Sequence, residues 1–164
     1  MTGPVLRPLA TRDLAVVEEL LDAQVGGRQQ ARLGELVDVL EGGGIVAVVA
    51  DRVVGVVTED LGHDTTELRV LAVAGPHQGT GLGGRLVDAV ADQATSRGSR
   101  LLWLVTTNDN LDALRLYQRH GFRLAELRPD AVAESRQRLK PAIPRTGQHG
   151  IPLRDELVLH RRLS

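Results

Sequence analysis

Glycines are concentrated in one short stretch, Gln78-Gly79-Thr80-Gly81-Leu82-Gly83-Gly84-Arg85, between an expected strand and an expected helix. Glycine allows a tight turn and a close approach of the backbone to a ligand. The N–H groups of a helix's first turn have no helical acceptor, and the helix dipole is positive there. The sequence therefore predicts an anion site at this turn, one that would fit a diphosphate.

Different ligands are consistent with this turn. The spacing Gly79-x-Gly81-x-x-Gly84 matches the dinucleotide-binding pattern, which also requires repeated βαβ units and an acidic residue about 20 positions on. Asp109 could be that acid, but an expected antiparallel hairpin upstream and a single βαβ unit disfavour this interpretation. A P-loop is excluded because it needs a lysine after the last glycine, and the chain's one lysine is Lys140. A turn that binds no ligand is disfavoured, because this many glycines at the start of a helix lower its stability.

The pattern Gln78-x-x-Gly81-x-Gly83 resembles the phosphate loop of the GCN5-related N-acetyltransferases (GNATs), Arg/Gln-x-x-Gly-x-Gly/Ala. A second segment, Asn110-x-x-Ala113-x-x-x-Tyr117-x-x-x-Gly121-Phe122, resembles the part of that family that lies along the acyl-CoA thioester. One expected strand separates the two segments, as the family requires. The resemblance implies an α/β fold with a mixed sheet, one domain over residues 1–164, and acetyl-CoA as the co-substrate.

Acetyl transfer from a thioester to an amine needs a neutral amine, a donor for the oxyanion and a proton for the departing thiolate. The resemblance makes Tyr117, the only tyrosine, the general acid, and a phenol with a pKa near 10 can protonate a thiolate. The alternative is a tyrosine whose ring simply packs on the core. The resemblance also implies an oxyanion donor among backbone N–H groups near Val73, where the family's strand splays from its neighbour.

Glu67 is the candidate base. In the histone-acetylating branch of the family a glutamate lies eleven positions before the Arg/Gln of the loop, which here is position 67. A partly buried carboxylate could accept an amine proton through water. Two alternatives stay open: a solvated glutamate at a strand edge, and a proton route through water with no single base.

The expected coenzyme A contacts come from the strand before the turn, the turn itself and the second segment. Arg85 and Arg115 are candidates for the adenosine 3′-phosphate, and Asn110 could equally be a helix N-cap. The full set of expected contacts is Leu71, Ala72, Val73, Gln78, Gly79, Thr80, Gly81, Leu82, Gly83, Gly84, Arg85, Asn108, Asn110, Ala113 and Tyr117.

The elements that position these residues follow from hydrophobic periodicity. The pattern predicts an antiparallel meander followed by a βαβ crossover, with Thr11 as the N-cap of the first helix, Asp51-Arg52 as a hairpin turn and Leu101 to Val105 as a buried parallel strand. Strands are expected over 5–9, 45–50, 53–58, 67–73, 101–105, 122–127 and 157–163, and helices over 14–21, 31–40, 82–95, 110–120 and 130–139.

About 30 residues separate Leu127 from Leu157, which is more than a hairpin needs, so residues 128–156 are an insertion before the last strand. Long loops beside a site are often lids or specificity elements, and packing on a second subunit of a homodimer is the alternative. Asp155 and Glu156 begin the last strand, which in the family borders the acceptor site. With Glu67 they could favour a cationic amine, the alternative being solvated charges.

Composition narrows the function. A net charge of -1 and 2% aromatic residues disfavour nucleic-acid binding. The absence of cysteine removes a cysteine acyl-enzyme and favours direct transfer. The five histidines show no metal-ligand spacing, so no metal is expected. The apolar runs are too short to span a membrane and the N-terminus lacks a signal-peptide profile, so we expect a cytoplasmic protein without a membrane partner.

Together these features predict an N-acetyltransferase that moves an acetyl group from acetyl-CoA to a primary amine by direct transfer in a ternary complex. The acceptor would be a small molecule or a peptide, and the fold alone does not name it. Two alternatives are a catalytically silent acyl-CoA-binding regulatory module and, less favoured, a dinucleotide-dependent enzyme.

Overall fold

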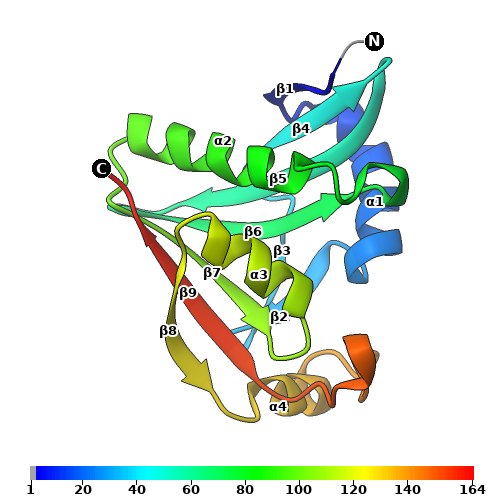
Figure 1. The fold of residues 1–164 in the computed structure, drawn as a ribbon. Helices are drawn as coiled ribbons and strands as arrows, with labels where there is room; N and C mark the ends of the chain where they lie inside the picture. The colour runs from blue at the N-terminus through cyan, green and yellow to red at the C-terminus, as the bar shows by residue number, and fades with distance from the viewer. Residues whose placement is uncertain (1–2) are drawn as a thin grey trace.

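A computed structural model describes residues 3–164. Its main sheet has seven strands in the order β1-β4-β5-β6-β7-β9-β8, and a two-stranded sheet pairs β2 with β3 (Figure 1). The strands are β1 (Val5–Pro8), β2 (Gln29–Arg32), β3 (Glu35–Asp38), β4 (Gly43–Val49), β5 (Arg52–Leu61), β6 (Thr65–Val73), β7 (Leu101–Thr107), β8 (Arg123–Arg128) and β9 (Glu156–Arg162). The helices are α1 (Leu14–Val25), α2 (Leu82–Ser96), α3 (Leu111–Arg119) and α4 (Ala131–Arg138).

The sheet is mixed. Strands β4, β5 and β6 form an antiparallel meander, and α2 then carries the chain to β7, which pairs parallel to β6. The last strand, β9, lies between β7 and β8 and is antiparallel to both. This confirms the predicted α/β fold, with a meander, a βαβ crossover and an insertion before the last strand.

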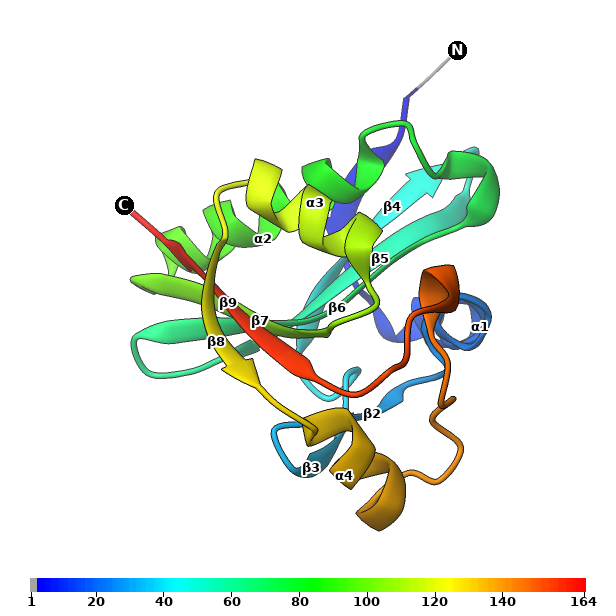
Figure 2. The same ribbon diagram turned by 60° about the horizontal axis from the view of Figure 1, so that its bottom comes forward.

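Strands β6 and β7 pair only at their beginnings, where Thr65–Glu67 lie beside Leu101–Trp103. Beyond that point β7, β9 and β8 turn away from β6, as Figure 2 shows. The N–H of Ala74 donates to Val54 of β5 at 2.9 Å. Because successive residues of a strand direct their N–H and C=O groups to opposite edges, those of Val73 and Leu71 face the open side.

Two hydrophobic clusters cover the two faces of the sheet. One lies under α2 and α3, and the other lies under α1. Leu86 and Leu159 are completely buried in the first cluster, and Leu21 and Val56 in the second. These clusters fix α2 and α3 on the face where the open edge of β6 begins.

The helix predicted over residues 31–40 is wrong, because this segment forms the β2–β3 hairpin. Leu33 and Gly34 have φ values of 53° and 77°, which form a tight turn and end any helix. The apolar spacing that suggested a helix is overridden by contacts with distant segments. Arg28 binds Asp38 at 2.8 Å beside the hairpin, and Lys140 donates to the Gln29 carbonyl at 2.7 Å.

Two smaller differences concern turns. Thr11 is not the N-cap of α1, because residues 11–13 form a 3₁₀ turn before it. Asp13 accepts the Ala10 N–H at 2.8 Å and pairs with Arg7 at 2.7 Å, and Arg7 lowers the pKa of the Asp13 carboxyl to about 2. The β4–β5 turn is centred on Ala50 and Asp51, which both have positive φ, one residue before the predicted pair.

The insertion contains α4, as predicted, and a long loop that is held by side chains bonded to backbone groups. Arg136 donates to the carbonyls of Ile143, Pro144 and Leu153 at 3.0, 2.8 and 2.6 Å. A short 3₁₀ turn at residues 148–150 brings this loop beside the first turn of α3. The loop is therefore a defined surface next to the open edge of the sheet.

Candidate active site

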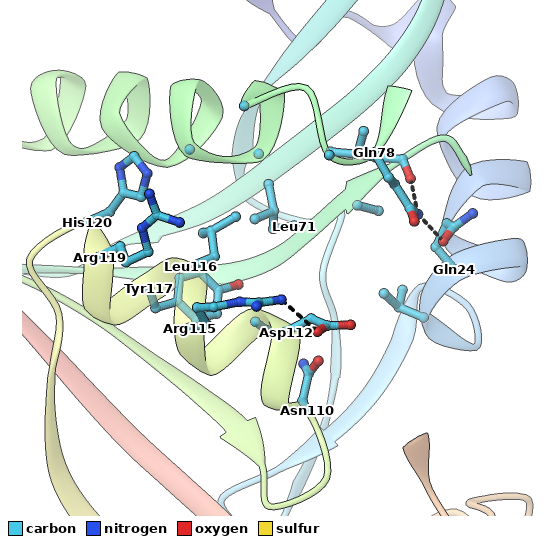
Figure 3. Close-up of a pocket in the computed structure, with 18 of the residues that line it drawn as sticks. Gln24, Leu71, Gln78, Asn110, Asp112, Arg115, Leu116, Tyr117, Arg119 and His120 are labelled. Carbon is cyan, nitrogen blue, oxygen red and sulfur yellow. Dashed lines mark hydrogen bonds and ion pairs between the residues drawn. The ribbon is translucent and has the colours of Figure 1, made fainter. Parts of the chain in front are cut away.

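A pocket of about 860 Å³ lies between β6, the start of α2 and the exposed side of α3 (Figure 3). It begins where β6 and β7 part, so strand, glycine turn and helix meet in one place. Most of the expected cofactor contacts line it: Leu71, Ala72, Val73, Gln78, Gly79, Gly81, Gly83, Gly84, Asn110, Ala113 and Tyr117.

The glycine turn has the geometry of an anion site. Gly79 and Gly81 have φ values of 75° and 86°, which L side chains rarely adopt. The N–H of Arg85 is the first to enter the helix, donating to the Gly81 carbonyl at 3.2 Å. The preceding N–H groups of α2 have no helical acceptor, and Gly83 and Gly84 line the pocket. An anion in the pocket would therefore meet these groups and the positive end of the helix dipole.

The side chain of Gln78 connects the glycine turn to β6 and to α1 by hydrogen bonds. Its side-chain amide donates to the Val73 carbonyl and to Gln24 of α1, both at 2.9 Å, and Figure 3 draws both bonds. The Val73 carbonyl therefore points to the open edge of β6, as the strand alternation requires. The turn and the unpaired edge of β6 are held together by one side chain.

Tyr117 lies on α3 and is 7% exposed. Its ring packs edge-on against Phe122, with centroids 5.5 Å apart. Burial raises the pKa of the phenol above its ordinary value. Tyr117 is one of the residues that line the pocket. A neutral phenol is therefore available there as a proton donor.

Four expected cofactor contacts do not line the pocket. The Thr80 hydroxyl donates to the His77 carbonyl at 2.6 Å, and the Leu82 side chain is buried in the core. Arg85 donates to the Pro4 carbonyl at 3.3 Å. Asn108 holds the insertion, because its carbonyl oxygen accepts the N–H groups of residues 154 and 155 at 3.0 and 2.9 Å.

At the N-terminus of α3, Asn110 occupies the N-cap position without a side-chain cap bond. Its amide donates to the Thr106 hydroxyl at 3.1 Å while the residue lines the pocket. Arg115 also lines the pocket and pairs with Asp112 at 3.1 Å (Figure 3). Of the two arginines expected near a phosphate, Arg115 is therefore the one at the pocket.

The expected base and acceptor carboxylates lie outside this pocket. Glu67 is 4% exposed, and its two oxygens accept from Arg32 at 2.5 and 3.0 Å and from Arg69 at 3.2 Å. Glu156 is 1% exposed, accepts the Leu33 N–H at 3.2 Å, and has its pKa raised by burial. Both carboxylates hold the β2–β3 hairpin against the sheet.

Asp155 is separate from these two carboxylates. One of its oxygens accepts the N–H of Asp130 at 2.7 Å, just before α4. This contact joins the beginning of the insertion to its end. The three acidic residues expected around an amine therefore do not share one open surface.

The sequence analysis missed several lining residues. Gln24 and Val25 come from α1, and Gln148 comes from the insertion. Arg119 and His120 lie between Tyr117 and Gly121 of the second segment, so the motif itself could have pointed to them. The other three are brought in by tertiary structure and left no local signal.

Comparison with known proteins identifies this arrangement. The Acetyltransferase (GNAT) family model matches residues 14–122, which include β6, the glycine turn and α3. The chain belongs to the GNAT acetyltransferase family. Among residues 3–164 of this GNAT protein, no three His, Cys, Asp or Glu residues gather as metal ligands, and no helix is both long and apolar enough to cross a membrane.

Two curated relatives resemble this GNAT protein in sequence. The uncharacterized protein YxbD of Bacillus subtilis is 33% identical over 114 residues, 70% of each chain. Streptothricin acetyltransferase of Streptomyces lavendulae is 44% identical over 52 residues, which are 32% of this chain and 28% of the relative. The second match is therefore local, although its identity is higher.

Many solved structures share the fold, and two of them align over almost the whole chain as follows. The IAA acetyltransferase of Bacillus cereus aligns with a TM-score of 0.79 and 25% identity, covering 98% of this chain and 100% of its own. A Bacillus subtilis acetyltransferase in complex with CoA aligns with a TM-score of 0.79 and 21% identity, covering 98% and 99%. The family match over residues 14–122 thus confirms the predicted acyltransferase class.

Proposed function

We propose that this GNAT protein transfers an acetyl group from acetyl-CoA directly to a primary amine while both substrates are bound. The observation that carries the proposal is that the glycine turn, the unpaired edge of β6 and the neutral phenol of Tyr117 line one pocket. Each supplies one requirement of thioester aminolysis: an anchor for phosphate, donors for the oxyanion and a proton for the thiolate.

The cofactor would bind mainly through main-chain groups. Its diphosphate would accept the N–H groups of the glycine turn, at the positive end of α2. Its pantetheine amides would pair with Leu71 and Val73 as an added strand does at a sheet edge. The thioester would then lie between β6 and α3, beside Tyr117.

In the transfer step the amine nitrogen attacks the thioester carbonyl carbon, and the N–H of Val73 or Leu71 donates to the oxyanion. The carbon–sulfur bond then breaks, and the sulfur takes the proton of the Tyr117 hydroxyl. Solvent restores that proton to the phenolate. The raised pKa of the buried phenol keeps it protonated before the transfer, and it also makes the phenol a weaker acid, so the developing thiolate must lie close to the hydroxyl.

The amine proton would leave through water. Glu67 is the candidate base, but both of its oxygens already accept hydrogen bonds from the guanidinium groups of Arg32 and Arg69. We therefore assign Glu67 to holding Arg32 and the β2–β3 hairpin. Glu156 is likewise engaged in structure, so a cationic acceptor has less support than an amine recognised by polar residues that line the pocket, Gln24, Asn110 and Gln148.

The test is acetyl-CoA turnover against a panel of small-molecule and peptide amines, following thiol release and the acetylated product. Direct transfer predicts initial-rate plots that intersect, whereas a covalent acyl-enzyme gives parallel lines. Tight CoA binding without turnover of any amine would instead favour the silent regulatory module. Thermal stabilisation by NADH but not by acetyl-CoA would favour the dinucleotide enzyme.

A further inference from the structure

Gly84 is a glycine that the phosphate-loop pattern does not require. It lies in the first turn of α2 with ordinary helical backbone, where alanine would be the more stable choice. A Cβ at this position would lie 2.5 Å from Cε1 of His120 and even closer to Nε2. The glycine therefore makes room for the imidazole ring of His120 against the turn that carries the free N–H groups.

The ring of His120 has a fixed orientation. Its Nδ1 is 3.2 Å from both carboxylate oxygens of Asp88, and Asp88 also accepts from Arg161 of β9 at 3.0 Å. A carboxylate is only an acceptor, so Nδ1 carries a hydrogen in both protonation states. The neutral ring then has a lone pair on Nε2, and only the imidazolium can donate from Nε2.

Nε2 of the ring lies against Gly84, at the part of the pocket that the glycine turn lines. His120 and Arg119 both line it, and Figure 3 shows the ring beside α2 with the Arg119 side chain next to it. The charged groups around the ring are Asp88 from α2, Arg161 from β9 and Arg119 from its own helix. Because Arg161 offsets Asp88, protonation of the ring adds a positive charge beside the glycine turn.

We propose that His120 is a phosphate ligand for coenzyme A that acts only as the imidazolium. Affinity for CoA then falls as pH rises through the range in which imidazoles titrate. Asp88 and Arg161 are positioning residues that orient the ring, and Gly84 allows its approach. This inference rests on the proposed function, since it assumes that CoA occupies this pocket.

The first experiment is calorimetric titration with CoA from about pH 6 to about pH 8.5 on the wild type, His120→Gln and Arg119→Gln. A charge-assisted hydrogen bond supports a loss of about tenfold in wild-type affinity over this range. His120→Gln should lack this loss, so the ratio of wild-type to variant affinity should fall by about tenfold over the range and approach one at high pH. Arg119→Gln is the matched control, because losing a charge that does not titrate should weaken binding equally at every pH.

Dephospho-CoA distinguishes the two phosphate sources. The 3′-phosphate of CoA also titrates near pH 6, but that change is common to all variants and cancels in their differences. A difference between wild type and His120→Gln that persists with dephospho-CoA assigns His120 to the diphosphate. A difference that disappears assigns it to the 3′-phosphate.

A second measurement needs no variant. If binding requires the imidazolium, the wild type takes up protons on binding CoA at about pH 7.5, where the 3′-phosphate is already ionised, and this uptake is detected as a dependence of the binding enthalpy on the buffer. Identical pH profiles for wild type and His120→Gln, or no proton uptake, would overturn the role of His120. An absence of CoA binding in the wild type at any pH would instead overturn the proposed function.

Discussion

Two regions flank the place where β6 and β7 separate, and they are built in different ways. The cofactor end consists of main-chain groups and glycines from segments close in sequence, residues 71–84 and 110–120. The opposite end is closed by the β2–β3 hairpin, whose Arg32 binds Glu67 from 35 residues away and whose Leu33 binds Glu156 from 123 residues away. The proposed cofactor site is therefore encoded locally, while the end that we propose for the acceptor depends on contacts that only the fold brings together.

This difference has a physical reason. All substrates that carry coenzyme A share the diphosphate and pantetheine, so backbone N–H groups can bind them whatever the side chains are. Acceptors differ, and side chains supply the variable contacts. Changes at one end should consequently leave the other end intact, and the following variants test that independence.

Tyr117→Phe should produce the largest effect. Loss of the general acid is expected to lower kcat by about 10²–10³-fold, because the thiolate must leave without a proton. The phenyl ring keeps the packing on Phe122, so CoA affinity and the melting temperature should change little. Steady-state kinetics and calorimetry check this, and an unchanged kcat would remove Tyr117 from the mechanism.

Arg32→Met should affect the acceptor end alone. It removes a guanidinium from Glu67, which is buried and keeps only Arg69, and should cost about 2 kcal/mol of folding free energy. The double variant Arg32→Met/Glu67→Met should recover most of that loss, because it leaves no unpaired charge. CoA affinity should be unaffected in both. A loss of CoA affinity in the single variant would show that the two ends are coupled.

Gly81→Ala should affect the cofactor end, with Gly98→Ala as its control. Both glycines have similar positive φ, 86° and 89°, and open space around a Cβ, so each substitution should cost about 1 kcal/mol of stability. Only Gly81→Ala disturbs the N–H groups of the pocket, and it should weaken CoA binding about tenfold. Equal CoA affinities in the two variants would argue against a diphosphate at this turn.

These contrasts match what the sequence could and could not predict. The β6–α2–β7–α3 unit was predictable because hydrophobic period, glycines and the Tyr117 segment all agree within one continuous stretch. The β2–β3 hairpin was not, since its apolar residues fit helical spacing and its turn uses Leu33 at a positive φ. Its ion pair with Glu67 and its backbone hydrogen bond to Glu156 join segments far apart in the sequence, and no local pattern reports them.

The same limit applies within the site. The resemblance predicts a role for backbone N–H groups near Val73. The alternating directions of the N–H and C=O groups along β6 agree with that prediction, because those of Val73 face the open edge. The position of Gln148 at the pocket could not be predicted, because it depends on a tertiary contact in which Asp109 accepts the Gln148 N–H at 2.8 Å. Homodimer formation stays a prediction from the length of the insertion.

Glu67→Gln should have a small effect on chemistry. If the amine proton leaves through water, kcat should fall less than about tenfold, whereas loss of a general base costs about 10²–10⁴-fold. The pH dependence of kcat/KM for wild type and variant provides the measurement. A large fall in kcat with an unchanged melting temperature would restore Glu67 as the base.

Asp13→Asn should have the smallest effect, at a pair that belongs to neither end. The carboxyl has a pKa of about 2 in the fold and about 3.9 when unfolded, so its contribution is present above about pH 4 and is lost as the pH falls toward 2. The variant should lose about 1 kcal/mol at neutral pH, and its stability should converge with the wild type in acid. Denaturant unfolding at several pH values measures both stabilities, and a difference between variant and wild type that persists in acid would contradict this role of Asp13.

The central claim is tested most directly by a crystal structure of the protein with CoA. The account predicts diphosphate oxygens on the N–H groups between Gly79 and Gly84, pantetheine along Leu71 and Val73, and the sulfur within about 4 Å of the Tyr117 hydroxyl. A sulfur atom on the far side of α3, or a diphosphate bound away from the glycine turn, would contradict it.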